Sequence, residues 1–509
     1  MLDDIKKRIE EYFAGEEKSE NSQNKTPFSA DISANLKAIK ELCSNTSDLV
    51  VREFTACGRR CAAVHIDGMI EKYDLAKTVV QPVMAQNFDK SASGEQVYQK
   101  LVSDVLFNVD RLEAENIEQC ILLMMSGFAA FIMDGSSSVS VFGLQGFKFR
   151  SIAEPVTETS QYGSQEGFCE AVRINMTMVR RRLKSTDLVF EFIESGQQSK
   201  TSVCVCYLKN MADPELLDSV RKKVRDAKLP NLLAAEYLKP FLQSSRLSLF
   251  DTVGITERPD VLCGKISEGR IGLLVDGTPD ALIIPYLFFE NFQTADDYAQ
   301  KPLFAMFSRW LRYLSFFIAL YLPAIYVALG VMHNELLPVQ LLIRLAQSEG
   351  STPFPIMEEV FALHLAFEII REAGLRMPRP ISNSVSFIAT LLIGEAAVNA
   401  GIISLPAVML VAITGICSFT SMTLYQPLAI LRLALILIGG TTGIIGIAVF
   451  SAGLLVHICS LHTGKIPLTA PISPLRLKSL RDFAARANWK ILGSKTVNVN
   501  KMPGTDNNG

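Results

Sequence analysis

The sequence predicts an α/β N-terminal body of two related subdomains, followed by an α-helical integral membrane domain. Of the 509 residues, 49% are hydrophobic and the mean hydropathy is +0.24, which is too apolar for an ordinary cytosolic protein. The apolar excess lies after residue 310, while the preceding part contains an internal repeat of β-rich runs and helical segments. We therefore expect one soluble body and one membrane body.

The first 27 residues are expected to form a flexible leader, because they are rich in Glu, Lys, Ser, Asn and Gln and bury little apolar surface. The start, MLDDIKKRIEEYF, lacks the apolar core of a signal peptide, so we expect the N-terminal body to remain in the cytoplasm. The net charge of -2 and the lack of a basic stripe with interleaved aromatic residues argue against a nucleic-acid partner.

The repeat divides the soluble part into subdomain 1, residues 28–155, and subdomain 2, residues 156–300. Each copy has an opening helix, a β-rich run followed by a helix, and two β-rich runs around an Asp-Gly turn. The repeated positions, which lie 142 residues apart, are Gly127 and Gly269, Asp134 and Asp276, Gly135 and Gly277, and Met69 and Met211.

No catalytic pattern is found in this body, and we expect no enzyme activity, no cofactor and no metal site. Asp134 and Asp276 precede glycine in predicted turns, which indicates a conformational role. Cys204 and Cys206 share one face of a predicted strand and are expected to be buried thiols, since no cysteine or histidine cluster has zinc-ligand spacing. The basic stretch VRRRLK, from Val179 to Lys184, is interpreted as a solvated helix face, with anionic lipid or an acidic partner as the alternative.

The membrane domain is expected over residues 301–464, with about four spans and additional interfacial or re-entrant helices. Arg309 and Arg312 flank RYLSFFIALYLPAIYVALGV, which is long enough to cross, and LLPVQLLIRLAQSEG is interpreted as interfacial or re-entrant. Pro406 begins a further span. Pro427 begins a run that continues to Cys459 and is interrupted by GGTTG, so it is either one long tilted helix or a helix broken at the glycines.

The stretch from Pro353 to Ile381, PFPIMEEVFALHLAFEIIREAGLRMPRPI, has apolar residues at helical spacing but also charges that cannot face lipid without cost. The spacing places His364, Glu368 and Arg371 on one face of a helix. Two interpretations remain open: an internally neutralised helix that holds a bundle together through Glu368 and Arg371, or a helix that supports gating of an aqueous path. The charged-helix candidates are Glu358, Glu359, His364, Glu368, Arg371 and Glu372.

Residues Ser384 to Ile403 are predicted to form a span with a polar stripe. Glu395 is its most informative residue, either a neutral or paired helix-packing group or part of a permeation path. The candidate pore-lining residues are Ser384, Ile388, Leu391, Glu395 and Asn399.

The tail, residues 465–509, carries eight basic and two acidic residues, a net charge of +6. The positive-inside rule therefore places both ends of the membrane domain on the cytoplasmic side and requires an even number of crossings. Four crossings are expected. Six would require the charged helix to span and the final apolar run to form a hairpin.

The charged stretch, followed by GEAAVNAGIIS, resembles the A subunit of bacterial spore germinant receptors, the GerA family. Segments of the soluble half are similar to family segments as well: RSIAEPVTET, QEGFCEAVRINMTMVRRRLK, NMADPELLDSVR, ERPDVLCGKISEGRIGLLVDGTPDALIIP and FQTADDYAQKPLFAMFSRWLR. The similarity covers residues 30 to 475.

The resemblance implies a multi-pass receptor of the spore inner membrane, in contact with membrane lipid. It implies a transporter-like B subunit and a lipoprotein C subunit as partners, and self-association into a homo-oligomer around a pore for monovalent cations. It also leaves alternatives: a SpoVA-associated relative that amplifies ion release, a non-conducting membrane scaffold, or a secondary transporter.

Overall fold

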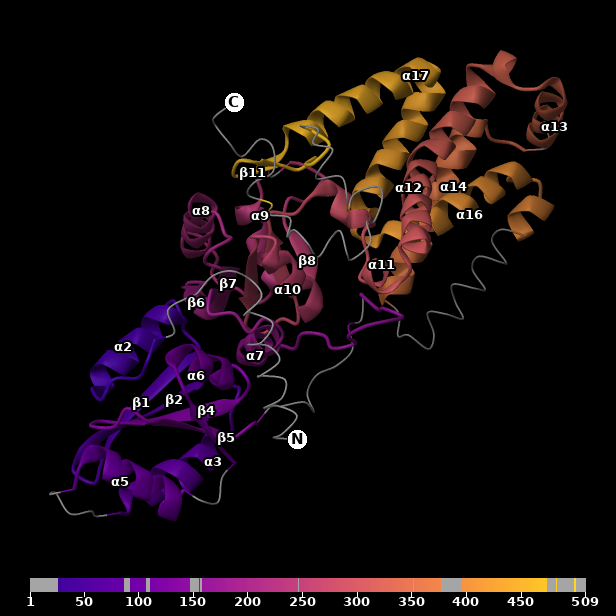
Figure 1. The fold of residues 1–509 in the computed structure, drawn as a ribbon. Coiled ribbons are helices and arrows are strands. Elements are labelled where there is room, and N and C mark those ends of the chain that lie inside the picture. Colours follow the sequence, from indigo (N-terminus) through magenta and orange to yellow (C-terminus); the bar gives the residue numbers. More distant parts are fainter. Residues whose placement is uncertain are drawn as a thin grey trace.

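The computed structural model describes residues 26–86, 92–106, 110–146, 155, 158–245, 247–350, 352–376, 395–473, 482 and 499. Three bodies lie in a row: subdomain 1, subdomain 2 and a helical bundle (Figure 1). Most of the predicted leader lies outside the described residues. The predicted α/β body is confirmed, and the region that follows it is helical, as predicted, and contains candidate membrane helices.

Subdomain 1 contains a five-stranded antiparallel sheet with strand order β1-β2-β4-β5-β3. Helices cover both faces, so that each face of the sheet has its own apolar core. The strands are β1 (Leu49–Ala56), β2 (Arg59–Ile66), β3 (Arg111–Ala114), β4 (Phe128–Met133) and β5 (Val139–Gly143). The helices are α2 (Ile32–Leu42) and α6 (Ile117–Met124) on one face, and α3 (Lys72–Asp74), η1 (Leu75–Val80), α4 (Gln81–Met84), α5 (Gly94–Lys100) and η2 (Leu101–Val105) on the other.

Subdomain 2 repeats this architecture with strand order β6-β7-β9-β10-β8. Its strands are β6 (Leu188–Ser195), β7 (Thr201–Leu208), β8 (Gly254–Thr256), β9 (Ile271–Val275) and β10 (Ala281–Ile284). One face is covered by α7 (Val172–Arg182) and α10 (Pro259–Ser267), the other by α8 (Pro214–Arg225), η3 (Ala235–Leu238) and α9 (Lys239–Leu242). Cys204 and Cys206 are both buried on the α7 face, as their spacing predicts.

The repeated Asp-Gly turns serve the same purpose in both subdomains. The Asp134 carboxylate accepts a hydrogen bond from the Ile32 backbone N–H at the start of α2, and Asp276 accepts one from Val172 at the start of α7. A carboxylate at this position satisfies a free N–H of the first helical turn. The following glycines have φ near +90°, which side-chain-bearing residues rarely adopt (Gly135 +87°, Gly277 +91°). The conformational role predicted for the two aspartates is therefore correct.

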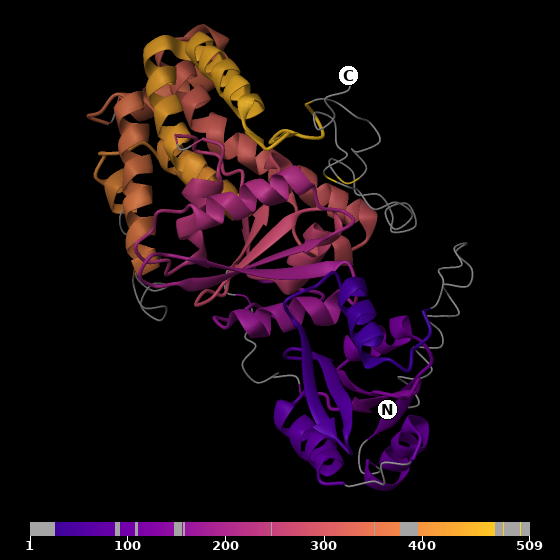
Figure 2. The same cartoon turned by 90° about the vertical axis from the view of Figure 1, so that its left-hand side faces the viewer.

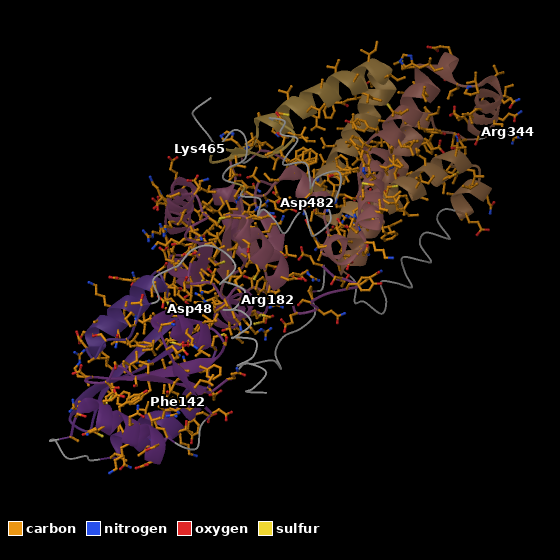
Figure 3. All side chains as sticks on the ribbon, in the orientation of Figure 1. Asp48, Phe142, Arg182, Arg344, Lys465 and Asp482 are labelled. Atoms are coloured by element: carbon orange, nitrogen blue, oxygen red, sulfur yellow. The ribbon has the colours of Figure 1, made fainter. Side chains whose placement is uncertain are left out.

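A buried ion pair joins the two subdomains. Arg180 on α7 donates from Nε to Asp48 Oδ2 at 2.8 Å and from Nη2 to Oδ1 at 3.0 Å, and the two side chains are only 1% and 3% exposed. Figure 3 places Asp48 at the boundary between the subdomains. Interpreting VRRRLK as a solvated face is wrong for Arg180. Helical periodicity groups charges on a face, but it does not reveal a carboxylate from another subdomain opposite that face.

The helical bundle follows two short elements, η4 (Phe288–Phe292) and α11 (Asp296–Ala299). Its helices are α12 (Pro302–Val331), η5 (Asn334–Leu336), α13 (Val339–Glu349), α14 (Ile356–Arg376), α16 (Leu405–Ser418), η6 (Phe419–Leu424) and α17 (Tyr425–Ser460). Among the described residues, α12 and the continuous helical run 405–460 are long and apolar enough to cross a membrane. A bilayer core of about 30 Å requires about 20 helical residues, so α13, with 11, is too short to cross.

We call the end of the bundle that faces subdomain 2 the near end and the opposite end the far end (Figure 2). The helix α12 runs from the near end to the far end. The helix α14 runs back, because Ile356 contacts the Gly330 region of α12 whereas Glu368 contacts Arg432 in the second turn of α17. The helix α16 runs in the same direction as α14, since Ser404 meets Glu359 and Ser418 meets Arg432.

The helix α17 is broken within the GGTTG sequence, one of the two alternatives that the sequence left open. Gly443 has φ +65° and ψ −156°, a combination that is open essentially to glycine alone. The first arm, residues 425–443, leads to the far end. The second arm, residues 444–460, returns to the near end, where His457 contacts Ser248 (Figure 1).

Residues after α17 pack on subdomain 2. The hairpin of β11 (His462–Thr463) and β12 (Ile466–Pro467) is followed by Leu468, whose carbonyl accepts from the Phe288 N–H at 2.9 Å. Lys465 forms an ion pair with Glu215 on α8 at 2.9 Å. The described start of the tail therefore lies on the same side of the bundle as the α/β body.

Candidate functional site

A carboxylate is enclosed where α14, α16 and α17 meet at the near end of the bundle. Glu368 on α14 accepts from Arg432 Nη2 at 2.6 Å and from Arg371 Nε at 3.0 Å. The Tyr425 hydroxyl lies 2.9 Å from both carboxylate oxygens. Arg432 also donates from Nη1 to Ser418 Oγ at 3.0 Å. We call these five residues the Glu368 cluster.

The cluster is largely closed to water. The Arg432 side chain is 1% exposed and that of Glu368 is 14% exposed, whereas Arg371 is 27% exposed and covers the Tyr425 ring at 4.2 Å from its centroid. Among the described residues, Arg432 Nε finds no hydrogen-bond partner. Two arginines face one carboxylate, so the cluster has a net charge of +1, which exposed Glu372 partly offsets from 3.9 Å. In the single chain, Glu368 is thus a neutralised group that ties three helices together.

The other charged-helix candidates are divided between two environments. Glu359 is buried, and its carboxylate accepts from the Ser404 N–H at the start of α16. His364 is also buried, with Nδ1 2.9 Å from the Val360 carbonyl and Nε2 3.2 Å from Thr414 Oγ1. Glu358 and Glu372 are exposed. His364, Glu368 and Arg371 do face inward together, as their spacing predicts.

The predicted polar stripe is described only in part. Glu395 and Asn399 lie in helical residues 395–399, where the described part of this stretch starts, and both are exposed. Ser384, Ile388 and Leu391 lie outside the described residues. Glu395 is therefore not part of the Glu368 cluster, and its side chain faces away from the packed interior of the single chain.

Sequence reasoning missed Arg432, the closest partner of Glu368. Arg432 is a lone basic residue in the apolar run YQPLAILRLALILIGG, and such a residue within a span normally pairs with another polar group. That rule implies a polar partner for Arg432 within the bundle, but it does not identify Glu368 as that partner.

A second buried ion pair, also missed, lies where the α/β body joins α12. Asp297 on α11 is fully buried and binds Arg309 Nη2 at 3.1 Å and Arg312 Nη2 at 2.6 Å. Arg309, also fully buried, reaches Asp482 Oδ1 at 3.2 Å. Burial alone raises the pKa of Asp297, but Arg312 and Arg309 outweigh it and hold the pKa below its usual range. These arginines were interpreted as a basic flank, yet they also anchor the first helix.

The short helix η4 connects this junction to the core of subdomain 2. Phe288 and Phe292 pack into the apolar cluster of α12 and α17, while Glu290 points the other way and binds Lys265 at 2.8 Å and Arg270. Burial raises the pKa of Glu290, but Arg270 and Lys265 lower it more, to about 2. A displacement of η4 would therefore change contacts both in the bundle and in the core of subdomain 2.

Comparisons with known proteins give one consistent family. The family model described as Bacillus/Clostridium GerA spore germination protein matches residues 37–497. The uncharacterised membrane protein YfkQ of Bacillus subtilis is 34% identical over 473 residues, 92% of this chain and 91% of that protein. Spore germination protein KA of the same organism is 31% identical over 480 residues, 93% and 88% of the two chains. The crystal structure of the N-terminal domain of the A subunit of the Bacillus megaterium spore germinant receptor GerK3 matches 52% of this chain and 99% of its own, with 28% identity and a TM-score of 0.42.

Proposed function

The chain belongs to the GerA spore germination family, and on that premise we propose that it is the A subunit of a nutrient-sensing germinant receptor that gates a cation path. A germination-related role and an association with a membrane follow from the family and from the apolar helices. The partners proposed with it are a transporter-like B subunit and a lipoprotein C subunit, together with further copies of this chain. The spore inner membrane is the proposed location.

We propose that the bundle crosses the membrane and that the α/β body and the tail share its cytoplasmic side. This is supported by the contacts of Lys465 and Leu468 with subdomain 2, because they hold the described start of the tail against the α/β body that precedes α12. An even number of crossings follows. The antiparallel course of α14 and the reversal of α17 at Gly443 favour six crossings over the four expected from sequence.

The number of crossings can be tested by the side on which Arg376 lies. Arg376, at the end of α14, has a side chain that is 79% exposed. With six crossings, Arg376→Cys lies on the cytoplasmic side and reacts with an impermeant maleimide added to inverted vesicles, whose outer surface is cytoplasmic. If α14 instead enters the membrane and returns to the far end, Arg376→Cys reacts only when the maleimide is added from the opposite side. Glu335→Cys in η5 serves as the far-end control.

The ion path is proposed to involve Glu395, and one observation carries this proposal. The buried carboxylates Glu359 and Glu368 are occupied by protein donors, whereas Glu395 and Asn399 face outward from the chain. A carboxylate on an outward face of a membrane helix is costly in lipid, so it is better placed where several copies enclose water. A ring of such carboxylates would favour cations over anions.

Cation flux through the reconstituted receptor tests this role. Glu395→Gln should lower the preference for K⁺ over Cl⁻ and slow nutrient-triggered release, because it removes one charge per copy. Glu335→Gln is the matched control, since Glu335 is a carboxylate of η5 that is 71% exposed and belongs to neither set of candidate residues. Unchanged selectivity in Glu395→Gln would instead support a non-conducting scaffold.

A SpoVA-associated relative that amplifies ion release is the second candidate, because the resemblance on which the first rests includes it. The two are separated by nutrient dependence. A germinant receptor subunit is required for the response to a specific nutrient, whereas an amplifier changes release after every trigger.

A further inference from the structure

The segment 247–250, between α9 and β8 of subdomain 2, is attached to the near end of the helical bundle at two points. Phe250 is 3% exposed and packs edge-on against Phe288, with ring centroids 5.8 Å apart, inside the apolar cluster of α12 and α17. Ser248 Oγ lies 3.1 Å from His457 Nε2, in the last turn of α17. The described part of this loop is therefore held against the helices.

Two leucines on the same loop turn outward in spite of this attachment. Leu247 is 96% exposed and Leu249 is 40% exposed. Isolated exposed leucines are common on protein surfaces, so exposure alone decides nothing. What matters is the helix that they adjoin: Leu455 and Val456, which precede His457 on α17, are 63% and 70% exposed. Exposed apolar side chains of α17 thus lie next in sequence to the residue that contacts this loop of the α/β body.

We propose that this loop is a membrane contact of subdomain 2, in which Leu247 and Leu249 insert among the acyl chains just below the lipid headgroups. The inference rests on the proposed crossing of the membrane by α12 and α17. Lipid that surrounds the end of α17 also reaches the loop, because Ser248 and His457 are in contact. Lipid is therefore the occupant that continuity with the helix surface selects.

The carboxylate that follows the loop does not oppose insertion. Asp251, the nearest carboxylate in sequence, is bound by Lys239 Nζ at 2.6 Å and by the Gln243 side chain. The start of α12, which lies on the same side of the bundle, also exposes apolar residues: Leu303 is 78% exposed and Phe304 is 55% exposed (Figure 1). Both places where the bundle meets subdomain 2 thus present apolar side chains at the near end.

Such a contact would hold subdomain 2 to the bilayer at a second place beside the covalent link to α12. A rigid body attached at two points cannot swivel about one of them. Subdomain 2 would then tilt only together with the second arm of α17. The contact with lipid would thus help to couple movements of subdomain 2 to movements of the helical bundle.

The test is the lipid exposure of a fluorophore at position 247 in the full chain. Leu247→Cys is made in a Cys459→Ser background, labelled with an environment-sensitive fluorophore, and reconstituted into vesicles of phosphatidylglycerol and phosphatidylethanolamine. Because Leu247 is almost fully exposed, the change does not disturb packing. Val449→Cys on α17, 68% exposed, is the lipid-facing control, and Met84→Cys in subdomain 1, 55% exposed, is the water-facing control.

The proposal predicts blue-shifted emission at position 247 and loss of fluorescence when a fraction of the lipid carries a nitroxide near the top of the acyl chain. Position 449 should be quenched by nitroxides deeper in the chain, and position 84 by neither. Quenching at 247 only by an aqueous quencher, with 449 quenched by lipid, would overturn this inference and leave the crossing of α17 intact. Emission at 247 that shifts only when a partner subunit is added would assign the loop to protein and also overturn it. An unquenched position 449 would instead refute the membrane crossing itself.

Discussion

The Glu368 cluster gives the sharpest prediction, because one carboxylate is shared by two arginines of unequal burial. Arg432 is 1% exposed and Arg371 is 27% exposed. Removing one partner of a buried ion pair typically costs about 3–5 kcal/mol, since the other charge remains buried and unpaired. Exposed pairs three residues apart on one helix contribute less than about 1 kcal/mol. Arg432→Gln should therefore destabilise the bundle much more than Arg371→Gln.

A double-mutant cycle isolates the coupling. We expect Glu368→Gln, which leaves the buried Arg432 without its carboxylate, to lower stability by about 3 kcal/mol. Arg432→Gln should lower it by about 2 kcal/mol, because Glu368 keeps Arg371 as a partner. The loss in the double variant should fall short of the sum of the two single losses by about 2 kcal/mol, because the buried Arg432 charge is removed together with its partner. The assay is the midpoint of unfolding of the purified chain in detergent, followed by tryptophan fluorescence over a denaturant series. The exposed Glu372→Gln should change stability by less than about 0.5 kcal/mol.

Two results would refute this reasoning. Additive effects of Glu368→Gln and Arg432→Gln would mean that the pair is not coupled. Equal effects of Arg371→Gln and Arg432→Gln would mean that burial does not set the cost. If the cycle holds but germination is unaffected in spores carrying the double variant, the cluster supports the fold and has no part in gating.

Three further predictions concern other parts of the chain. The pKa of Glu290 lies at about 2, below its ordinary 4.5, so its ion pairs stabilise the fold fully above pH 4.5 and are lost as the pH falls towards 2. This loss amounts to about 3 kcal/mol. It should be absent in Glu290→Gln when the free energy of unfolding is measured as a function of pH. Gly443→Ala should destabilise the chain by about 1–3 kcal/mol in thermal unfolding, because φ is +65° and the new methyl group would lie 2.6 Å from His333 Nε2. Gly453→Ala is the control: a methyl group there has no atom within 4 Å, so the change should be neutral or slightly stabilising. Asp48→Asn should loosen the joint between the subdomains, seen as faster amide hydrogen exchange in α7 with exchange in β9 unchanged; uniform acceleration would contradict a local role.

The sequence was most informative where a local rule and the tertiary fold coincide. The Asp-Gly turns at Asp134 and Asp276 revealed the duplication, and the structure gives each the same duty, which is to cap the opening helix of its own subdomain. The inward face of His364, Glu368 and Arg371 followed from helical spacing alone. Both rules concern residues whose geometry is set within one element or one repeat.

The sequence was least informative where a charge is balanced by a distant residue. Arg180 meets Asp48 132 positions away, and Arg432 meets Glu368 64 positions away. Periodicity predicts that such residues share a face with others of their kind, but not which element lies opposite. For Arg432 the cost of a lone charge among apolar residues did imply a partner, and the partner's identity needed the arrangement of the helices.

Two buried ion pairs lie at the joints between successive bodies of the molecule, and a third lies between helices of the bundle. Asp48 and Arg180 join subdomain 1 to subdomain 2, Asp297 and Arg309 join subdomain 2 to the first helix, and Glu368 and Arg432 join three helices of the bundle. An apolar joint can slide through many nearly equal arrangements, whereas a buried ion pair must keep its geometry or leave a charge unpaired at a cost of about 3–5 kcal/mol. Displacement of one body should therefore move its neighbour as a unit or switch it between discrete arrangements. The proposed passage of a signal from the α/β body to the bundle would need joints of this kind.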